Sequence, residues 1–389
     1  MKILSISHSC VISEYQKRMV EVAQYPDIEL TLLVPYNWTQ FNKAITLEKD
    51  NDQNYTILSN KPMTWGLKKN TLRNVTHIYP GTRRFLTRLK PDIVELWEEP
   101  FSAVAAHTIF WARRAIPKAK IVFFSAQNVF KRYPFPFSAF ERYTYENASH
   151  AFLVNEEVGD IVRRKGFEGE FTVLPLGVDT DFFCKQEVSS LKERLGIRDF
   201  TVGFFGKIAW QKGILHLIEA VSQIQEEIQL LIIGNGDLRD EADHLVTSLG
   251  LRDRTIIIDA VAHRQVPDFL NCLDLLVLPS ITLPHVKEQF GRVIIEAMAC
   301  EVPVIGSDSG EIPSTIGDAG PIFREGDVSD LKEKIEGLMR NRDLRSLLAK
   351  RGRKRVLENF SWKVIAKRQH QVYTKLMSGG NDLSDRQPS

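Results

Sequence analysis

The segment KEQFGRVIIEAMA, residues 287–299, places two carboxylates, Glu288 and Glu296, in a run that is otherwise mostly apolar. Phe290 and Gly291 are expected to open a helix, with Glu288 in the loop before it and Glu296 on it. A helix that begins at glycine offers unpaired N–H groups and a positive dipole end to an anion such as a diphosphate. A carboxylate on that helix can accept hydrogen bonds from the vicinal hydroxyls of a ribose. A solvated Glu296 is the alternative, but an apolar setting favours a bound partner, because burial of an unpaired charge is costly.

Lysines and glycines gather in a second segment, Gly206 to Gly213, directly after the apolar run Val202–Phe205. Lys207 and Lys212 stand on either side of this loop, and two such cations can neutralise a diphosphate. Glycine at each end lets the backbone turn and approach a ligand closely. Ordinary surface lysines are the alternative. The position after the first strand of a nucleotide-type domain favours the binding role.

A third segment, IGNGD at residues 233–237, matches part of a dinucleotide fingerprint but lacks its last glycine, because Arg239 stands there. It also follows the second strand of its half of the chain instead of the first. We therefore reject a nicotinamide site. A glycine turn at Gly234 and Gly236, against which a nucleobase can stack, is the expected role.

Short apolar runs alternate with amphipathic segments, which predicts parallel strands joined by right-handed helical crossovers. The first expected strands are Lys2–Ile6, Glu29–Val34, Ile93–Trp97, Ile121–Phe124 and Ala151–Val154. After the turn-rich residues 175–179, a second series follows at Val202–Phe205, Leu230–Ile233, Thr255–Ile258, Leu275–Leu278 and Val302–Ile305. Helices are expected at Val328–Arg340, Leu344–Glu358 and Trp362–Met377. The expected fold class is α/β, with two doubly wound Rossmann-like domains that face a cleft and bind ligands beyond the carboxyl ends of their strands.

In this order, the three segments resemble the retaining glycosyltransferases of family 4, which have the GT-B fold. The resemblance covers roughly residues 175–322, and the E-x7-E element from Glu288 to Glu296 is its most specific part. The segment PVIGSDSGEIP, residues 303–313, is also similar to the family. The family implies an acceptor-binding domain at 1–178, a nucleotide-sugar donor-binding domain at 179–360 and a helix at 361–377 that packs back toward the first domain. The polar composition of residues 378–389 predicts a disordered tail.

The resemblance also implies roles for single residues. Glu296 would bind the donor ribose, Glu288 would contact the donor sugar, and Lys207 and Lys212 would hold the diphosphate. Backbone at Phe290, Gly291 and Arg292 would meet phosphate or sugar hydroxyls, Gly206 would turn the lysine loop, and Gly234, Gly236 and Val261 would flank the base. The family works without a metal, so neither a metal nor another cofactor is expected, and the departing phosphate oxygen would take the acceptor proton.

Three positions depart from the family. The loop after the first expected strand, SHSCV at residues 7–11, lacks the paired glycines that are common there. Lys207 stands where many relatives have arginine, which keeps the charge but loses bidentate geometry. Glu301 stands where glycine is usual, in a turn that is expected to lie at the surface.

Polar residues at the ends of the expected first-half strands are candidates for acceptor binding, namely His8, Ser9, Glu98, Glu99, Gln127 and Asn128. The two carboxylates can bind hydroxyls or relay a proton, and solvated acids in a turn are an equal alternative. Each amide offers a donor and an acceptor to sugar hydroxyls. A satisfied structural role is an equal alternative for His8.

Residues 53–91 contain no Asp or Glu but eight cations, namely Lys61, Lys68, Lys69, Arg73, Arg83, Arg84, Arg88 and Lys90. Apolar side chains are interleaved, namely Trp65, Leu67, Leu72, Phe85, Leu86 and Leu89. This mixture suits a peripheral contact of residues 61–90 with an anionic membrane, at ~1 kcal/mol per cation near the surface. Two alternatives are solvated cations on a packed helix and guidance of an anionic acceptor.

The bulk composition excludes several classes. The 51 basic and 49 acidic residues nearly balance, which argues against nucleic-acid binding. Cys10, Cys184, Cys272 and Cys300 form no C-x-x-C pair and fit reduced thiols better than a disulfide framework or zinc site. The N-terminal apolar run is too short for a signal sequence, and no apolar stretch approaches the ~20 residues that span a bilayer. A cytoplasmic protein is expected, with at most peripheral contact at the inner face of the cell membrane.

The predicted function is that of a retaining, metal-independent glycosyltransferase of the hexosyltransferase type. It would move a sugar from a nucleoside-diphosphate sugar to a saccharide or lipid-linked acceptor, in cell-surface polysaccharide or glycolipid synthesis. The alternatives are a non-catalytic sugar-nucleotide-binding partner of another transferase and a sugar-nucleotide epimerase or phosphorylase with the same fold. The complete E-x7-E element and lysine pair favour the enzyme.

Overall fold

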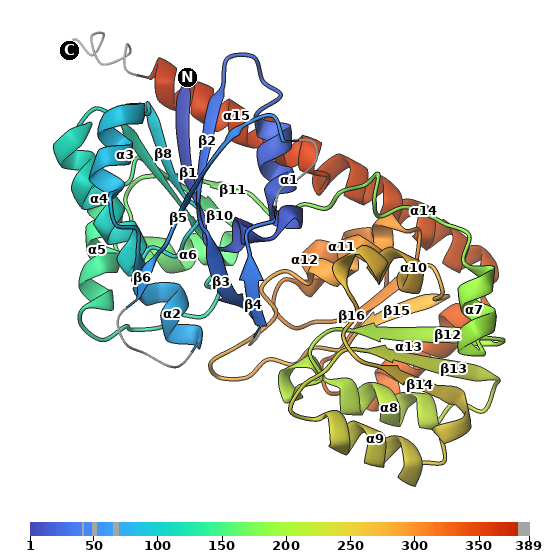
Figure 1. Cartoon of the computed structure of the whole chain (residues 1–389). Helices are drawn as coiled ribbons and strands as arrows, with labels where there is room; N and C mark the ends of the chain where they lie inside the picture. Colours follow the sequence, from blue (N-terminus) through green and yellow to red (C-terminus); the bar gives the residue numbers. More distant parts are fainter. Residues whose placement is uncertain (41–42, 49–52, 65–69, 380–389) are drawn as a thin grey trace, which may run out of the picture. The chain divides into compact units, whose positions relative to one another are not determined.

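The computed structural model describes residues 1–40, 43–48, 53–64 and 70–379, and the chain divides into two compact units (Figure 1). The first unit comprises Met1–Pro175 and Trp362–Ser389, and the second comprises Leu176–Ser361. The sequence-based boundaries lie at residues 178 and 360. Of the tail expected to be disordered, residues 380–389 lie outside the described residues.

A seven-stranded sheet with the order β11-β10-β9-β8-β1-β2-β5 forms the centre of the first unit. All its strand pairs are parallel. The strands are β1 (Lys2–Ile6), β2 (Glu29–Pro35), β5 (Thr56–Asn60), β8 (Ile93–Leu96), β9 (Lys120–Ser125), β10 (His150–Leu153) and β11 (Glu170–Val173). The central β8 and β10 are buried at every position, as apolar runs in a sheet covered on both faces should be. The strand order reverses between β1 and β8, so a ligand site is expected at their carboxyl ends.

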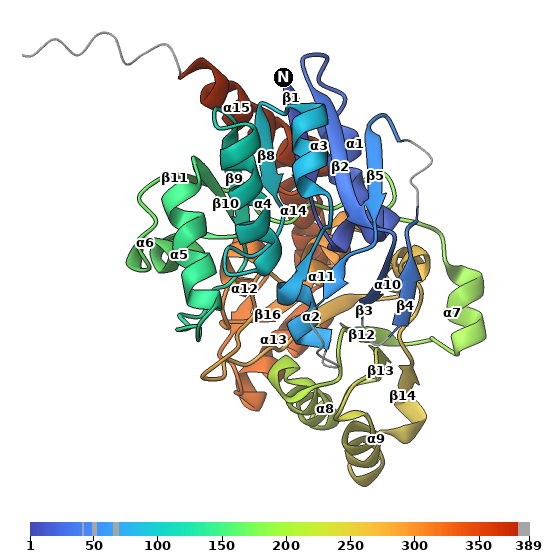
Figure 2. The same cartoon turned by 60° about the vertical axis from the view of Figure 1, so that its left-hand side comes forward.

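Helices cover both faces of this sheet. They are α1 (Ser13–Val22), α2 (Asn70–Thr76), α3 (Thr82–Leu89), α4 (Ala103–Ala115), α5 (Phe137–Asn147), α6 (Glu156–Arg164) and α15 (Trp362–Ser378), with the 3-10 turn η1 (Ser9–Val11). Helix α4 packs between α3 and α5 (Figure 2). Two short antiparallel ribbons join β3 (Asn37–Gln40) to β4 (Lys43–Thr46) and β6 (Met63–Thr64) to β7 (His77–Ile78).

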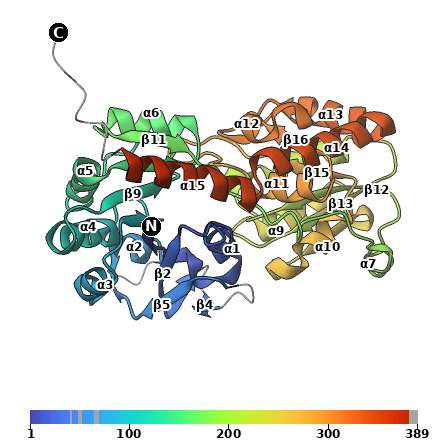
Figure 3. The same cartoon turned by 90° about the horizontal axis from the view of Figure 1, so that it is seen from above.

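Helix α15 belongs to the first unit although it follows the second along the chain. It packs against α1 (Figure 3). A buried carboxylate, Glu95 on β8, fixes this packing, because Tyr373 Oη donates to its Oε1 at 2.8 Å. Arg18 of α1 donates to the same oxygen at 2.9 Å, and its side chain is 2% exposed. The last helix is therefore held by a satisfied buried charge pair as well as by apolar contact.

The second unit contains a six-stranded sheet with the order β14-β13-β12-β15-β16-β17. All its strand pairs are parallel. The strands are β12 (Phe200–Phe205), β13 (Ile228–Ile233), β14 (Thr255–Ile258), β15 (Leu275–Leu278), β16 (Val304–Ser307) and β17 (Ile322–Phe323). In chain order this is the 3-2-1-4-5-6 arrangement of a Rossmann-like fold, and it reverses between β12 and β15.

Helices also flank the second sheet. They are α7 (Ser189–Leu195), α8 (Ile214–Ser222), α9 (Arg239–Ser248), α10 (Val266–Leu270), α11 (Arg292–Ala299), α12 (Ile312–Ile316), α13 (Val328–Arg340) and α14 (Arg342–Asn359). The 3-10 turns are η2 (Trp210–Lys212), η3 (Arg252–Arg254), η4 (His263–Gln265) and η5 (Gly317–Ala319). Helix α8 packs with α9 and α13, while α11 packs with α10, α12 and α14. The strands predicted from apolar runs are confirmed, with ends that differ by a residue or two.

Candidate functional site

Two loops meet at the strand-order reversal of the second unit. Residues 206–213 follow β12, and residues 279–291 follow β15, its neighbour in the sheet. The amide of Ile281 donates to the carbonyl of Gln211 at 3.0 Å, so the two loops are directly bonded. Ligands of doubly wound sheets bind at such a point, and both loops carry residues predicted to hold the donor.

Glycine makes this close approach possible. Gly213 ends the lysine loop with a φ of 65°, and a Cβ built on it would lie 1.8 Å from the carbonyl oxygen of Pro279. Gly234, at the end of β13, has a φ of 152°, and its Cβ would lie 1.8 Å from the carbonyl oxygen of Gly206. Neither position has room for a side chain. The predicted glycine turn therefore packs closely against the lysine loop, and Gly236 likewise packs on the carbonyl of Ile208.

Lys212 and Glu288 form an ion pair across the two loops. Lys212 Nζ lies 2.6 Å from Glu288 Oε2, and Ser280 Oγ donates to the same oxygen at 2.9 Å. The Lys212 side chain is 28% exposed and that of Glu288 is 11% exposed. A partly shielded ion pair is stronger than one in bulk solvent, and its cation is still open to a ligand. The structure thus brings together two of the predicted residues.

Lys207 pairs with a different acid. Its Nζ lies 2.9 Å from Asp237 Oδ2, and the two side chains are 54% and 82% exposed. Such an exposed pair contributes little to stability, so the lysine can exchange Asp237 for an anionic ligand at small cost. Sequence reasoning missed Asp237 as its partner.

Helix α11 begins at Gly291, as predicted, with a φ of 80° and without a side-chain cap. Phe290 before it is buried, and its carbonyl accepts a hydrogen bond from Thr315 Oγ1 at 2.8 Å. Arg292 is the first residue of the helix. The buried phenylalanine fixes the entry of the chain into the helix, and the first amides of a helix can bind an anion.

Glu296 lies on the buried side of α11 and is 7% exposed. His263 Nε2 approaches its Oε1 to 4.0 Å, and the His263 ring stacks on Phe182 at a centroid distance of 5.8 Å. His263 stands in the loop after β14, which also holds the half-buried Val261. Gly234 donates from its amide to the carbonyl of Ile258, the last residue of β14, at 3.0 Å. The predicted base-flanking residues therefore come from adjacent loops.

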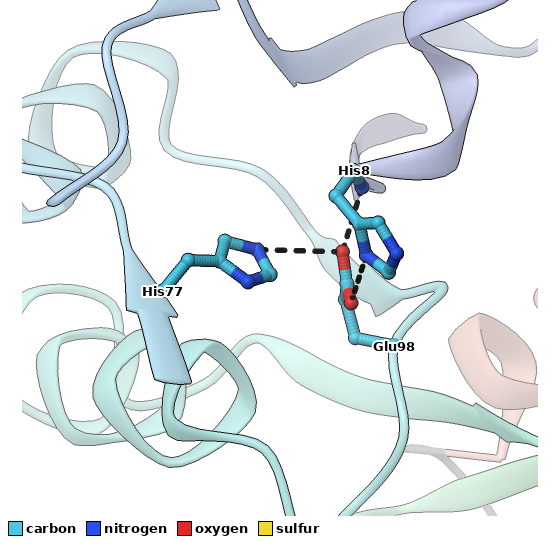
Figure 4. A group of neighbouring side chains, drawn as sticks. All are labelled: His8, His77 and Glu98. Carbon is cyan, nitrogen blue, oxygen red and sulfur yellow. Dashed lines mark hydrogen bonds and ion pairs between the residues drawn. The ribbon is translucent and has the colours of Figure 1, made fainter. Parts of the chain in front are cut away.

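In the first unit, His8 and Glu98 meet at the corresponding reversal between β1 and β8 (Figure 4). Glu98 Oε1 accepts from the His8 amide at 2.7 Å, and Oε2 lies 2.7 Å from His8 Nδ1. Ser9 is in the same loop, with its Oγ 2.9 Å from Ser7 Oγ. His77, which sequence reasoning missed, is fully buried behind them, and burial lowers its pKa to about 4. The predicted loop thus contains an oriented imidazole that is 21% exposed.

The neighbouring carboxylates Glu98 and Glu99 bind different partners. Glu99 accepts hydrogen bonds from Ser125 Oγ at 2.7 Å and from the Ala126 amide at 3.0 Å, and burial raises its pKa. Glu99 therefore shapes the loop after β9, where the backbone amide of Gln127 donates to Ser125 Oγ at 3.3 Å. Asn128, next in the chain, is 2% exposed. Both acids are hydrogen-bonded within the unit, and four of the predicted acceptor-side residues, His8, Ser9, Glu99 and Gln127, are partly exposed.

Only part of the basic stretch can be placed, because residues 65–69 lie outside the described residues. On α3, Leu86 is fully buried, whereas Arg83, Arg84 and Arg88 are exposed. The Arg83 guanidinium lies 5.4 Å from the centre of the Trp111 ring. Among the helices that the structure describes, none is long and apolar enough to span a membrane.

Several partners of the predicted residues had no local sequence signal. Asp237, His263 and His77 lie in other segments of the chain than the residues they face, so only the tertiary structure reveals them. Ser280 was recognisable as a strand-end residue but not as a donor to Glu288.

The segment that carries these loops is similar in sequence to known glycosyltransferases. Residues 188–355 match the family described as glycosyl transferases group 1. The capsular polysaccharide biosynthesis glycosyltransferase CapM of Staphylococcus aureus is 32% identical over 188 residues, 46% of this chain and 47% of that protein. The N-acetyl-alpha-D-glucosaminyl L-malate synthase of Bacillus anthracis is 29% identical over 205 residues, 50% and 51% of the two chains. The chain spans about half the length of the curated relatives it matches.

Solved structures match over nearly the whole chain. Sucrose-phosphate synthase of Thermosynechococcus elongatus has a TM-score of 0.74 at 20% identity, covering 97% of this chain and 100% of that one. A glycosyltransferase of Rickettsia africae has a TM-score of 0.72 at 18% identity, covering 97% and 98%. The fold is GT-B, with two Rossmann-like units. The lysine loop, the glycine turn and the E-x7-E segment all fall within residues 188–355, the part of the chain that matches the glycosyl transferases group 1 family.

Proposed function

We propose that the chain is a retaining, metal-independent glycosyltransferase of family 4 that moves a hexosyl-type sugar from a nucleoside-diphosphate sugar to a saccharide or lipid-linked acceptor. The observation that carries this proposal is the pairing of Lys212 with Glu288, beside the start of α11, inside the segment that matches the family. These groups supply a cation, a carboxylate and a helix N-terminus at the strand-order reversal, which together suit a sugar diphosphate.

The donor nucleotide binds the second unit. Glu296 accepts hydrogen bonds from the ribose hydroxyls, and its 7% exposure means that the contact forms away from bulk water. The base lies against the glycine turn at Gly234 and the loop that contains Val261. The first amides of α11 and the ammonium groups of Lys207 and Lys212 neutralise the diphosphate without a metal ion.

In the transfer step, the bond between the sugar's anomeric carbon and the diphosphate oxygen breaks, and the leaving diphosphate keeps the electron pair. Lys212 can turn from Glu288 to this oxygen, where negative charge develops, and so stabilises the transition state more than the ground state. The acceptor oxygen bonds to the anomeric carbon on the face that the diphosphate leaves, and its proton passes to the departing phosphate. Glu288, which still accepts the hydrogen bond of Ser280 Oγ, then binds a donor-sugar hydroxyl.

The acceptor binds the first unit. The partly exposed imidazole of His8 and the side-chain amide of Gln127 offer hydrogen bonds to the acceptor's hydroxyls. Glu98 and Glu99 act through these loops, by orienting His8 and residues 125–127 respectively.

Cell-surface polysaccharide or glycolipid synthesis in the cytoplasm is the proposed setting, and the match to the capsular polysaccharide enzyme CapM supports it. A peripheral contact of residues 61–90 with anionic lipid belongs to the same proposal. The exposed Arg83, Arg84 and Arg88 on α3 support it.

Product formation tests this function. Purified chain is incubated with UDP-, GDP- and ADP-sugars, each with saccharide and lipid-extract acceptors, and release of the nucleoside diphosphate is followed. The proposal expects acceptor-dependent release with one donor class, and proton NMR of the product should show the donor's anomeric configuration. Binding without release would indicate the non-catalytic partner, and a changed sugar on intact nucleotide would indicate the epimerase.

A further inference from the structure

Three side chains of the first unit that are far apart in sequence converge on one point (Figure 4). His8 follows β1, His77 is on β7, and Glu98 follows β8. Each offers one ligand atom, and these atoms lie within 4.8 Å of one another. Glu98 is 1% exposed and His77 is fully buried, while His8 reaches solvent.

Hydrogen bonds inside this cluster leave one lone pair without a donor. His77 Nδ1 lies 3.1 Å from the carbonyl oxygen of Asn74 and therefore carries the proton of a neutral ring. Its Nε2 is then an acceptor, and this atom is buried without a hydrogen-bond partner. It faces Glu98 Oε1, another acceptor, at 3.7 Å.

A proton on His8 does not supply a hydrogen-bond donor to His77 Nε2. A proton on His8 Nδ1 satisfies Glu98 Oε2 at 2.7 Å but does not reach His77. Among the residues that the structure describes, the ion-pair contacts of Glu98 are with the two histidines, and no lysine or arginine nitrogen lies within 4.0 Å of it. Two buried acceptors that face each other favour a cation between them.

We propose that His8, His77 and Glu98 bind a divalent transition-metal ion of the zinc class. Two imidazoles and one carboxylate are a ligand set that Zn²⁺ takes, with a fourth position left open. Imidazole disfavours Mg²⁺ and Ca²⁺, which prefer oxygen ligands. The bond from His77 Nδ1 to the carbonyl of Asn74 is the outer-shell contact that metal-bound histidines make.

The observed distances are close to those that such an ion requires. Zn–N and Zn–O bonds of about 2.1 Å hold tetrahedral ligand atoms about 3.4 Å apart. The separation of His77 Nε2 from Glu98 Oε1, 3.7 Å, needs to close by a few tenths of an ångström. His8 Nδ1 and Glu98 Oε2, 2.7 Å apart, need to open as the ion replaces the shared proton. Ligation through Nδ1 leaves the other ring nitrogen of His8 available for hydrogen bonding.

The surroundings suit a bound ion whose fourth ligand comes from solvent. The rings of Trp38 and Tyr79 lie 4.9 Å and 5.5 Å from that of His77, and both side chains are fully or almost fully buried. These buried aromatic rings cover one side of the cluster, whereas the side chain of His8 is 21% exposed. The fourth position would hold water or a hydroxyl group. This site consists of residues other than those assigned to the donor diphosphate, and the ion would bind whether or not the chain transfers a sugar.

Cobalt titration of the full chain tests the proposal. Untagged protein is stripped with EDTA, the chelator is removed, and Co²⁺ is added while its visible d–d absorption is followed. One equivalent should bind with the intense bands of a tetrahedral site, and one equivalent of Zn²⁺ should abolish them. His8→Asn and Glu98→Gln should each weaken binding by more than about 100-fold, because loss of an outer-shell partner alone costs 10–100-fold.

Two further variants make the result specific. His107→Gln alters a histidine on α4 of the same unit, outside the cluster, and should leave stoichiometry and affinity unchanged. His77→Phe should abolish binding, with circular dichroism to check its fold. If that variant does not fold, the partly exposed His8→Asn decides. Absence of tetrahedral Co²⁺ binding in the wild type, or unchanged binding in both His8→Asn and Glu98→Gln, would overturn the proposal.

Discussion

The ammonium nitrogen of Lys212 lies 2.6 Å from Oε2 of Glu288, so the cation expected at the diphosphate is held by the carboxylate expected at the donor sugar. Ser280 Oγ shares that oxygen at 2.9 Å and can keep Glu288 in place when the lysine leaves. Under the proposed function, donor binding would exchange one partner of Lys212 for another instead of burying an unpaired charge. The pair holds both groups in position before the donor arrives.

Lys212→Ala should lower kcat more than it weakens donor binding. The ammonium gains most as the diphosphate departs, and loss of one such group typically costs about 10²–10³ in kcat. Lys212→Arg should recover part of the rate, and Lys334→Ala on α13, which pairs with Asp330, is the matched control. Steady-state kinetics of nucleoside diphosphate release measure both parameters. An unchanged kcat with a raised KM would refute the transition-state role.

Gly213→Ala should destabilise the protein more than Gly250→Ala. The two glycines have similar φ values, 65° and 70°, so each alanine incurs about 1–2 kcal/mol of left-handed strain. The Gly213 Cβ would also lie 1.8 Å from the Pro279 carbonyl oxygen, whereas the Gly250 Cβ meets nothing within 4 Å. Overpacking should add about 1–3 kcal/mol at Gly213. Urea unfolding measures the difference, and equal losses would mean that the loops after β12 and β15 are not in contact.

Donor binding should not depend on a divalent ion. The two lysines and the first amides of α11 provide the positive charge that a metal would otherwise supply. Calorimetry with the preferred nucleotide should give the same affinity in EDTA as in excess Mg²⁺. An affinity at least tenfold lower in EDTA would show that the diphosphate needs a metal.

The stability of the fold should fall as pH drops below about 6.5, in part because of His150. Burial lowers the pKa of this side chain, which is 3% exposed, to about 4. Between pH 4 and 6.5 the unfolded chain therefore binds more protons at His150 than the folded chain does, and stability rises with pH. His150→Gln should remove up to about 1.4 kcal/mol per pH unit of this slope. Urea unfolding at several pH values measures it. The exposed His244→Gln is the control, and an equal slope in both variants would contradict the assignment.

Sequence reasoning found the strands that are buried on both faces and missed three of the four strands at the sheet edges, whereas it predicted β14, the edge strand at Thr255–Ile258. Strands β12, β13 and β15 are rich in apolar residues, and almost every residue in them is buried. Strands β5 and β11 lie at the two edges of the first sheet, with partly exposed patterns, and β17 has two residues. An edge strand needs fewer apolar side chains, so its sequence gives a weaker signal.

The site residues were predictable as a group because the carboxyl ends of neighbouring parallel strands meet at one edge. Individual pairings were not, since they depend on loop conformation. Glu98 and Glu99, for instance, form an apparent pair in sequence, yet successive side chains near a strand end point in different directions. One therefore binds His8 and the other binds Ser125.

The backbone conformation of Glu301 shows why glycine is usual at this position in the family. It follows the end of α11 with a φ of 57°, the left-handed conformation that glycine adopts at helix ends without steric cost. The sequence alone indicated a tolerant turn. The structure supplies the physical reason why relatives have glycine at this position.

Glu296 is the residue proposed to bind the donor ribose, and calorimetric titration with UDP, GDP and ADP tests this role most directly. One nucleotide should bind the wild type, and Glu296→Ala should weaken it at least tenfold, because a hydrogen bond to a charged group contributes about 1.5–3 kcal/mol. Glu333→Ala, an exposed glutamate on α13, should bind like the wild type. Unchanged affinity in a folded Glu296→Ala variant, or no binding of any nucleotide by the wild type, would contradict the proposed donor site.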